Sequence, residues 1–247
     1  MQDFTKYNPN PQGAGVRQAV LSGEALFFQR IYLWMCAGLG LTAALAFVLS
    51  SSGEWINFLL GHRWVLYVVI FGELGLVMFL SARLHSLSPG AVKGLFLLYA
   101  ALNGVTFSVL FLVYPTYAFV KAFICTAGIY GAMAIYGLVT KRSLQAWGSF
   151  LFAGVVGLIL ASLVNIFWKS YQFDLVICVL GVLIFAGLTA YDHQKLRVLH
   201  YSLESQGLGG VEAVDQQSRL VVMGALKLYL DFINIFLFLL RLFGRRD

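Results

Sequence analysis

The chain has 247 residues, of which 60% are hydrophobic and only 11% are charged, and its formal net charge is +6. A water-soluble domain carries roughly 25% charged residues, so this composition excludes an ordinary soluble protein and indicates a polytopic membrane protein. The excess of basic residues does not indicate a nucleic-acid partner, because they fall mostly between apolar runs, as topology signals do.

The first 29 residues are polar and mixed, without the short apolar stretch and small-residue cleavage site of a signal peptide. We expect residues 1–29 to form a cytoplasmic tail and residues 30–247 to form one transmembrane domain. The first apolar run, residues 31–53, contains no charged side chain and is long enough to span the hydrocarbon core.

Seven hydrophobic segments follow one another along the chain, each close to the ~20 residues that a helix needs to cross a bilayer. They cover residues 30–52, 64–82, 94–114, 117–139, 146–168, 175–192 and 220–242. The polar stretch at residues 193–219 is predicted to extend the sixth helix and then to form a flexible loop. The pattern predicts an all-α, polytopic bundle of seven transmembrane helices.

Lysine and arginine are distributed unequally between the two sides of such a bundle. If the N-terminus is cytoplasmic, the inner side holds Lys6, Arg17, Arg30, Arg83, Lys93, Lys141, Arg142, Lys195, Arg197 and Arg219. The outer loops hold only Arg63, Lys121 and Lys169, and this bias predicts a cytoplasmic N-terminus. Arg241, Arg245 and Arg246 would lie outside if the seventh segment crosses fully, whereas a re-entrant segment would return them to the cytoplasm; we favour a full crossing.

Small residues recur at the spacing that lets two helices approach closely. They are Gly90/Gly94, Ala100/Gly104 and Ala153/Gly157/Ala161. We interpret them as sites of tight packing within the bundle.

Asp192 follows the uncharged run at residues 175–191 and precedes Lys195 and Arg197. A charged side chain at the bilayer centre costs about 2.5–3.5 kcal/mol even on the mildest insertion scale, so an aspartate in this position needs an explanation. The structural explanation is that Asp192 lies at the cytoplasmic membrane edge, satisfied by water or by Lys195 one turn later.

Asp231 is harder to explain by position, since uncharged residues lie on both sides of it, at 228–230 and 232–240. Its structural explanation is a same-helix ion pair with Lys227 at i−4. The functional explanation pairs Asp231 with Asp192 across adjacent helices. Two carboxyls in contact would share a proton and titrate as a unit, and once ionised they would offer the oxygen ligands that calcium prefers.

Two further charged residues lie in or beside the second segment. Glu73 is at its middle and could face the same interior, and Arg83 is at its cytoplasmic end. Arg83 could act as a latch on an ionised aspartate, although its simpler role is to extend to lipid headgroups. His193 could assist pH sensing, and a solvated histidine is the alternative.

The stretches GLTAYDHQKLR and GALKLYLDFINIFLFLLRLFG, together with the seven-segment pattern, closely resemble the Bax inhibitor-1 family, in particular its proteobacterial inner-membrane branch. The resemblance implies six helices around a central seventh, and a di-aspartyl pH sensor at Asp192 and Asp231. It also implies a pH-dependent calcium leak in a bacterial inner membrane, with calcium bound transiently by the two aspartates and no cofactor. Arg83 is only an approximate match to the arginine latch of some members, and Lys227 is a departure that could weaken the switch.

Three functions are compatible with the sequence. A passive, pH-gated cation leak is the leading hypothesis, with no enzyme activity. The resemblance also allows a non-transporting regulator of a membrane-anchored AAA protease or a stress-response complex. Intramembrane aspartyl proteolysis is the third, but the sequence around Asp231 is LYLD and lacks the G-x-G-D context of such proteases.

Overall fold

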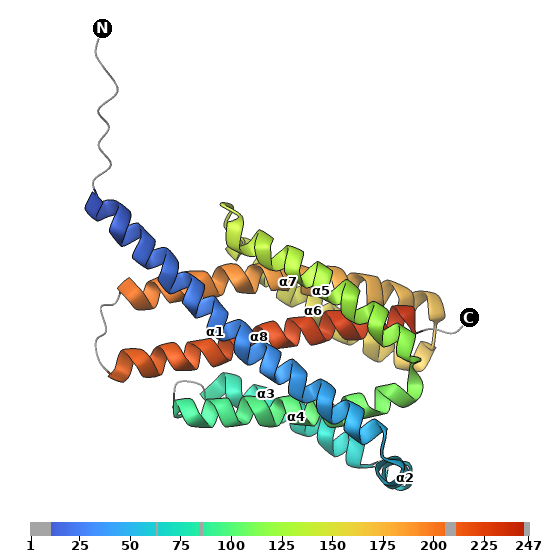
Figure 1. The fold of residues 1–247 in the computed structure, drawn as a ribbon. Helices are drawn as coiled ribbons and strands as arrows, with labels where there is room; N and C mark the ends of the chain where they lie inside the picture. Colours follow the sequence, from blue (N-terminus) through green and yellow to red (C-terminus); the bar gives the residue numbers. More distant parts are fainter. Residues whose placement is uncertain (1–10, 63, 84–85, 206–210, 245–247) are drawn as a thin grey trace.

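The computed structural model describes residues 11–62, 64–83, 86–205 and 211–244, and every regular element in them is an α-helix. In chain order the helices are α1 (Pro11–Ser50), α2 (Gly53–Gly61), α3 (Trp64–Arg83), α4 (Pro89–Val113), α5 (Thr116–Val139), α6 (Gln145–Trp168), α7 (Tyr171–Ser205) and α8 (Val211–Phe243) (Figure 1). The all-α prediction is confirmed.

Among the described residues, seven helices are long and apolar enough to cross a membrane: α3 to α6 over their whole length, α1 from Gly23, α7 to Leu203 and α8 from Val214. They correspond to the seven predicted segments. The short helix α2 was not predicted; it begins after Ser52, whose side chain accepts a hydrogen bond from the Trp55 backbone N–H.

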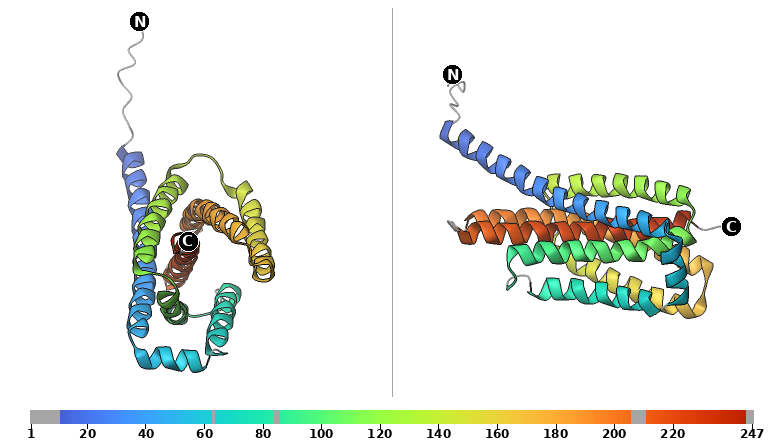
Figure 2. Two further views of the ribbon diagram at one scale, coloured as in Figure 1. Left: turned by 90° about the vertical axis from the view of Figure 1, so that its right-hand side faces the viewer. Right: turned by 60° about the horizontal axis from the view of Figure 1, so that its bottom comes forward.

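Helix α8 is at the centre of the bundle. In its most apolar stretch 67% of the residues are buried, against 6% in α3 and 11% in α6. It packs against α1, α4, α5 and α7, and a view along the bundle shows these helices around it (Figure 2). The expected arrangement of helices around a central C-terminal helix is therefore present.

Helices α3 and α6 lie at the periphery, where α3 packs mainly on α4 and α6 mainly on α7. Their remaining surfaces carry exposed apolar side chains, including Phe71 and Met78 on α3 and Phe152 on α6. In a protein that spans a bilayer, such surfaces face lipid.

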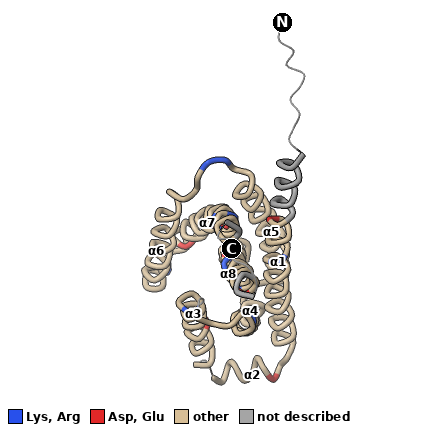
Figure 3. Tube along the Cα trace, turned by 90° about the vertical axis from the view of Figure 1, so that its left-hand side faces the viewer, with Lys and Arg blue, Asp and Glu red and all other residues tan. Residues whose placement is uncertain are grey.

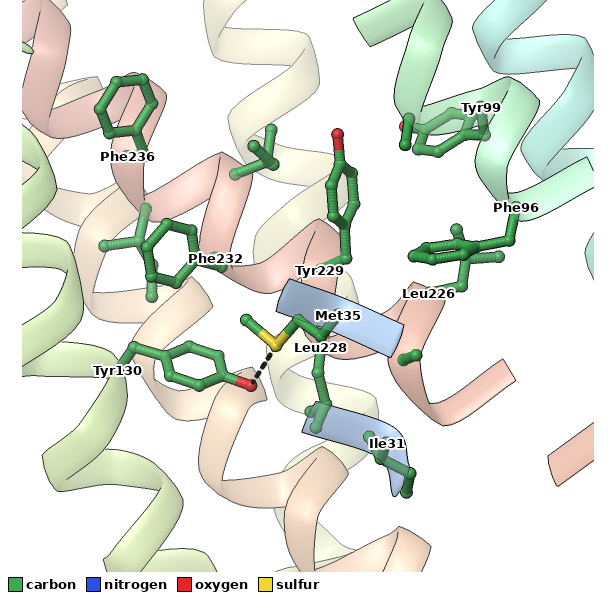
Figure 4. Packing of buried hydrophobic residues seen from close by; sticks show 14 of the residues in the cluster. Ile31, Met35, Phe96, Tyr99, Tyr130, Leu226, Leu228, Tyr229, Phe232 and Phe236 are labelled. Atoms are coloured by element: carbon green, nitrogen blue, oxygen red, sulfur yellow. Dashed lines mark hydrogen bonds between the residues drawn. The ribbon is translucent and has the colours of Figure 1, made fainter. Parts of the chain in front are cut away.

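Tyr229 on α8 joins three helices in the apolar core (Figure 4). The centroids of the Phe96 and Tyr99 rings of α4 lie 5.9 and 6.0 Å from the centroid of its ring, in edge-on contact. Thr42 on α1 donates its hydroxyl hydrogen to the Ala100 carbonyl at 2.8 Å, so the Tyr229 hydroxyl, 2.7 Å away, is the donor to Thr42.

The predicted boundary between tail and domain, at residue 29/30, falls inside α1, which begins at Pro11. Phe27 and Phe28 are buried, Phe27 stacked on His200 and Phe28 on His193 of α7. Glu24 pairs with Arg197 of α7, so the part of α1 around residues 24–28 packs against the polar extension of α7. The predicted flexible loop is also shorter than expected, since α7 continues to Ser205 and α8 begins at Val211; residues 206–210 lie outside the described residues.

Helix α8 runs the length of the bundle without a break, so its last turn lies at the opposite end of the bundle from its first turn and from the last turn of α7 (Figure 1). This is the geometry of a full crossing. Arg241 in the last turn of α8 forms an ion pair with Asp174 in the first turn of α7. Asp174 thus neutralises Arg241 at the end of the bundle where the charge bias predicted few basic residues. Arg245 and Arg246 lie outside the described residues.

Close packing at small residues is confirmed only where a helix meets an inner neighbour. A Cβ atom at Gly104 would lie 2.7 Å from the Leu45 Cβ of α1, whereas one at Gly90, Gly94 or Gly157 would meet nothing within 4 Å. A close backbone approach between helices involves a glycine that the spacing did not indicate: a Cβ atom at Gly137 of α5 would lie 2.9 Å from the Ala190 Cα of α7.

We therefore expect Gly137→Ala to lower the free energy of unfolding by about 1–3 kcal/mol, because the new methyl group would force α5 away from the α7 backbone. Gly131→Ala, on the same helix but with open space around its Cα, is the matched control and should not lower stability. Thermal unfolding of the two variants in detergent is the measurement, and equal melting temperatures would contradict the prediction.

Candidate functional site

Asp192 of α7 and Asp231 of α8 line the same cavity. It has a volume of about 550 Å³ and is walled by α6, α7 and α8. Both residues are buried, with exposed fractions of 7% and 5%. Apart from these two carboxylates, the polar groups of the lining are Lys227, Asn234 and Ser162, and the rest is apolar. The cavity thus places two acidic groups among apolar side chains within the membrane-spanning part of the bundle.

Asp231 has the less favourable environment of the two. Its Oδ2 atom is buried and has no hydrogen-bond partner among the described residues. The charges of Asp192 and Lys227 both act on it. A buried polar atom left without a partner costs about 1–3 kcal/mol, so Asp231 is an energetic weakness that packing of the central helix has to offset.

Lys227 pairs with Asp192 and not with Asp231. Its Nζ atom lies 3.1 Å from the Asp192 Oδ1 atom, and this ion pair joins α7 to α8. Both local ion pairs considered from the sequence are therefore wrong. Lys195 lies over the Tyr191 ring, 5.5 Å from its centroid, and the Lys227 ammonium group forms its ion pair with α7 and not with the carboxylate on its own helix.

The two carboxyl groups share one cavity without a hydrogen bond between them in the described part of the chain. The ammonium group of Lys227 holds Asp192 instead. A proton shared between the two carboxyls would compete with the Lys227 ammonium group for Asp192. The arrangement is that of a carboxylate pair in which one member is neutralised by a lysine.

Glu73 and Arg83, the accessory candidates, do not line this cavity. The Thr106 hydroxyl of α4 donates to the Glu73 Oε1 atom at 2.7 Å, which directs Glu73 toward α4. Arg83 is exposed at the end of α3 and makes no ion pair with either aspartate in the part of the chain that the structure describes. A latch between Arg83 and the aspartates is absent from this arrangement.

His193 was expected to be solvated in the simpler interpretation, and this is wrong: its side chain is fully buried. The Thr189 carbonyl can only accept a hydrogen bond, so the His193 Nδ1 atom, 2.6 Å away, carries the proton. The Nε2 atom of the neutral ring then accepts from the Tyr32 hydroxyl of α1 at 3.0 Å. Helical spacing could have predicted the burial of His193, because Leu196 and His200, three and seven residues later, are buried on the same face of α7.

Neighbouring residues of α7 bind other parts of the bundle. Gln194 accepts a hydrogen bond from the Leu144 N–H at 2.7 Å and donates to the Arg142 carbonyl at 2.9 Å. Arg197 forms an ion pair of 3.0 Å with Glu24 of α1 and donates to the Leu138 carbonyl at the end of α5. The stretch that begins at Asp192 therefore fixes α7 relative to α1, α5, α8 and the α5–α6 loop.

The cavity cannot supply a complete calcium coordination sphere. Calcium takes 6–8 oxygen ligands, and the described residues contain no group of three or more His, Cys, Asp or Glu side chains that could hold a metal. The two carboxylates and the Asn234 amide are the strongest oxygen donors that line the cavity. Water would have to provide the remaining ligands, which suits a passing ion better than a resident one.

Comparisons with known proteins agree with the fold and with these motifs. A family model described as "Inhibitor of apoptosis-promoting Bax1" matches residues 24–247. The chain is 40% identical over 225 residues to the Inner membrane protein YbhL of Escherichia coli (strain K12), covering 91% of this chain and 94% of that protein. This chain belongs to the Bax inhibitor-1 family.

Further relatives of this Bax inhibitor-1 family protein come from other bacterial species. A Deinococcus radiodurans protein is 42% identical over 236 residues, with 96% of this chain and 97% of that protein covered. A Borreliella burgdorferi protein is 37% identical over 220 residues, with 89% and 92% covered. The name of the Escherichia coli relative, together with seven apolar helices, supports a multi-pass inner-membrane location.

The Lys227–Asp192 ion pair leads to a stability prediction. Lys227→Met would leave the buried Asp192 carboxylate without its partner, and we expect it to lower the free energy of unfolding by roughly 1–3 kcal/mol, between the values for exposed and buried pairs. Lys195→Met removes the lysine one turn from Asp192 and should change stability by less. Thermal unfolding in detergent measures the stability of both variants. If Lys195→Met lost more stability than Lys227→Met, the ion pair of Asp192 with Lys195 on its own helix would be the more important one.

Proposed function

We propose that this Bax inhibitor-1 family protein is a passive, pH-sensitive leak for cations, with calcium as the main ion, and that it has no enzyme activity. The observation that carries the proposal is the pair of acidic side chains on adjacent helices, in one cavity, with an oxygen of Asp231 left without a partner. Such carboxylates inside a membrane are rare and usually belong to ion or proton pathways.

The position of Asp231 supports a transmembrane path. It lies close to the middle of the membrane-spanning part of α8, Val214–Phe243, where no water is available unless a cavity supplies it. A cation that reached the cavity would find the Asp231 Oδ2 atom without a partner. It would gain Asp192 as a second ligand only by displacing the Lys227 ammonium group.

Protonation controls such a path directly. With Asp192 and Asp231 ionised, the cavity attracts a divalent cation; with the carboxyls protonated, the cavity loses that attraction and Lys227 loses its partner. Lys227 thus competes with the cation for the ionised form of Asp192. The proposed switch consists of two carboxyls, one lysine and the two helices that carry them.

We expect Asp231→Asn to lower calcium permeability at least about tenfold and to flatten its dependence on pH. At an effective dielectric constant near 20, unit charges ~4 Å apart interact by ~4 kcal/mol, so the loss of one carboxylate is more than sufficient for this effect. Calcium entry into proteoliposomes loaded with a fluorescent indicator, at several pH values, is the measurement.

Glu54→Gln is the matched control, since it removes an exposed carboxylate on α2, outside the membrane-spanning helices. It should leave both flux and pH profile unchanged. If Asp231→Asn retained the flux and pH profile of the unaltered protein while remaining folded, the aspartate pair would not be the switch.

Lys227→Met should raise calcium permeability, because a cation would no longer have to displace the ammonium group that pairs with Asp192. The same liposome assay measures the flux. Lys195→Met should leave the flux unchanged, and an equal rise in both variants would show that Lys227 acts only through bulk charge.

The rival proposal is a non-transporting regulator of a membrane-anchored AAA protease or a stress-response complex. It predicts that the protein co-purifies with that partner and alters proteolysis equally well with Asp231→Asn. The flux assay separates the two, because the regulator has no flux to lose. Intramembrane aspartyl proteolysis is less compatible with the site, since Lys227 occupies Asp192 where such catalysis needs two carboxyls that share a proton.

A further inference from the structure

A second cleft lies on another side of α7, where the α5–α6 loop crosses the end of the bundle. Its volume is about 310 Å³, and its lining includes Tyr136 at the end of α5, Trp147 at the start of α6, and Gly187 and Ala190 of α7. The deeper part of the lining is apolar, with Leu151 buried at 7% exposure. None of the lining residues belongs to the aspartate cavity.

The loop over this cleft is held in place by α7. Gln194 bonds to the loop backbone twice, at the Leu144 N–H and the Arg142 carbonyl. These bonds fix the part of the loop that carries Arg142. The mouth of the cleft is therefore preformed, because these hydrogen bonds hold the loop in place without a ligand.

Basic side chains surround this mouth. Arg142 lines the cleft, and Lys195 lines a smaller adjoining cavity of about 180 Å³; Ser143 and Tyr191 line both. Lys141 precedes Arg142 in the loop, which appears as a basic arc between α5 and α6 in Figure 3.

In the part of the chain that the structure describes, no carboxylate forms an ion pair with Lys141, Arg142 or Lys195. Two cations nearby are paired, Arg197 with Glu24 and Lys227 with Asp192. The mouth of the cleft therefore carries an excess of positive charge, whereas the neighbouring cations Arg197 and Lys227 are neutralised by carboxylates.

Aromatic side chains flank the same mouth. Trp147 is 57% exposed and Tyr136 is 47% exposed, and such side chains concentrate at the level of lipid headgroups. An apolar cleft below a basic, aromatic mouth at this level matches a ligand with an anionic head and an apolar tail.

We propose that this cleft binds an anionic phospholipid, with the phosphate group at Arg142 and Lys195 and the upper part of an acyl chain between α5 and α6. A lipid fits the cleft better than a free phosphate ion, because an acyl chain would contact the apolar deeper lining and a phosphate ion would not. It does not depend on the proposed cation leak, since no residue is common to the two cavities.

The test is lipid binding to the purified full-length protein, followed by native mass spectrometry. Phosphatidylglycerol and phosphatidylcholine with the same acyl chains are titrated separately, and we expect phosphatidylglycerol to bind more tightly. Each basic residue near a membrane surface contributes about 1 kcal/mol to binding of anionic lipid. Arg142→Gln and Lys195→Gln should therefore each weaken phosphatidylglycerol binding about fivefold and leave phosphatidylcholine binding unchanged.

Lys121→Gln is a matched control, because Lys121 lies over the Tyr117 ring at 5.3 Å much as Lys195 lies over Tyr191 at 5.5 Å. It removes the same charge and the same type of contact elsewhere on the bundle, and it should bind phosphatidylglycerol as the unaltered protein does. Melting temperatures confirm that the three variants are folded.

Several results would overturn the proposal: equal binding of the two lipids, unaltered phosphatidylglycerol binding in both Arg142→Gln and Lys195→Gln, or an equal loss in Lys121→Gln. Competition with inorganic phosphate is the final measurement. If it displaces phosphatidylglycerol at equal concentration, the cleft recognises the anion alone and is not a lipid site.

Discussion

A carboxylate in the apolar interior of a membrane has to be protonated, hydrated or paired, and the ion pair between Lys227 and Asp192 meets this requirement for only one of two aspartates. One ammonium group faces two carboxylates in the same cavity. Because it lies 3.1 Å from Asp192, Asp231 keeps an oxygen without a partner. The two carboxylates are therefore not equivalent: Asp192 is neutralised by Lys227, and Asp231 has an oxygen available for a ligand.

The ion pair also belongs to a larger pattern on α7. Successive residues of a helix point about 100° apart, since there are 3.6 residues per turn, and α7 uses this to bind different neighbours. Asp192 binds α8, His193 binds α1 and Gln194 binds the α5–α6 loop. A shift of α7 that released Lys227 would strain all of these contacts. This argues that any rearrangement of the aspartate pair is carried by side chains or by α8.

The fold was largely predictable because its signals are local. Length and hydropathy defined the seven spans, and the charge of Asp231 within an apolar run marked it as exceptional. The choice of partner by Lys227 was not predictable in the same way. The rule of i and i+4 neighbours describes one helix, whereas the observed pair depends on how α7 and α8 are rotated against each other. That rotation is set by packing along both helices and by no short motif.

The two features that extend beyond their predicted limits share one cause. The start of α1 and the end of α7 are polar enough to look like a tail and a loop, but Phe27 and Phe28 stack on His200 and His193. Each partner supplies the apolar or aromatic surface that the other needs, so the start of α1 and the length of the α7 extension could not be predicted from either sequence alone. Histidine was the misleading residue, because its polarity suggests solvent while its ring packs like an aromatic side chain.

The central position of α8 explains how an unsatisfied carboxylate can be maintained. Asp231 follows Leu228 and Tyr229, both fully buried, and the contacts of Tyr229 tie α8 to α1 and α4. The packing energy of these neighbours offsets the cost of the free oxygen, and a peripheral helix such as α3 or α6 could not supply it. For the proposed leak the same arrangement sets a limit on rate. In that proposal a cation can use both carboxylates only after it displaces Lys227 from Asp192, so this displacement would limit the rate even when both carboxylates are ionised.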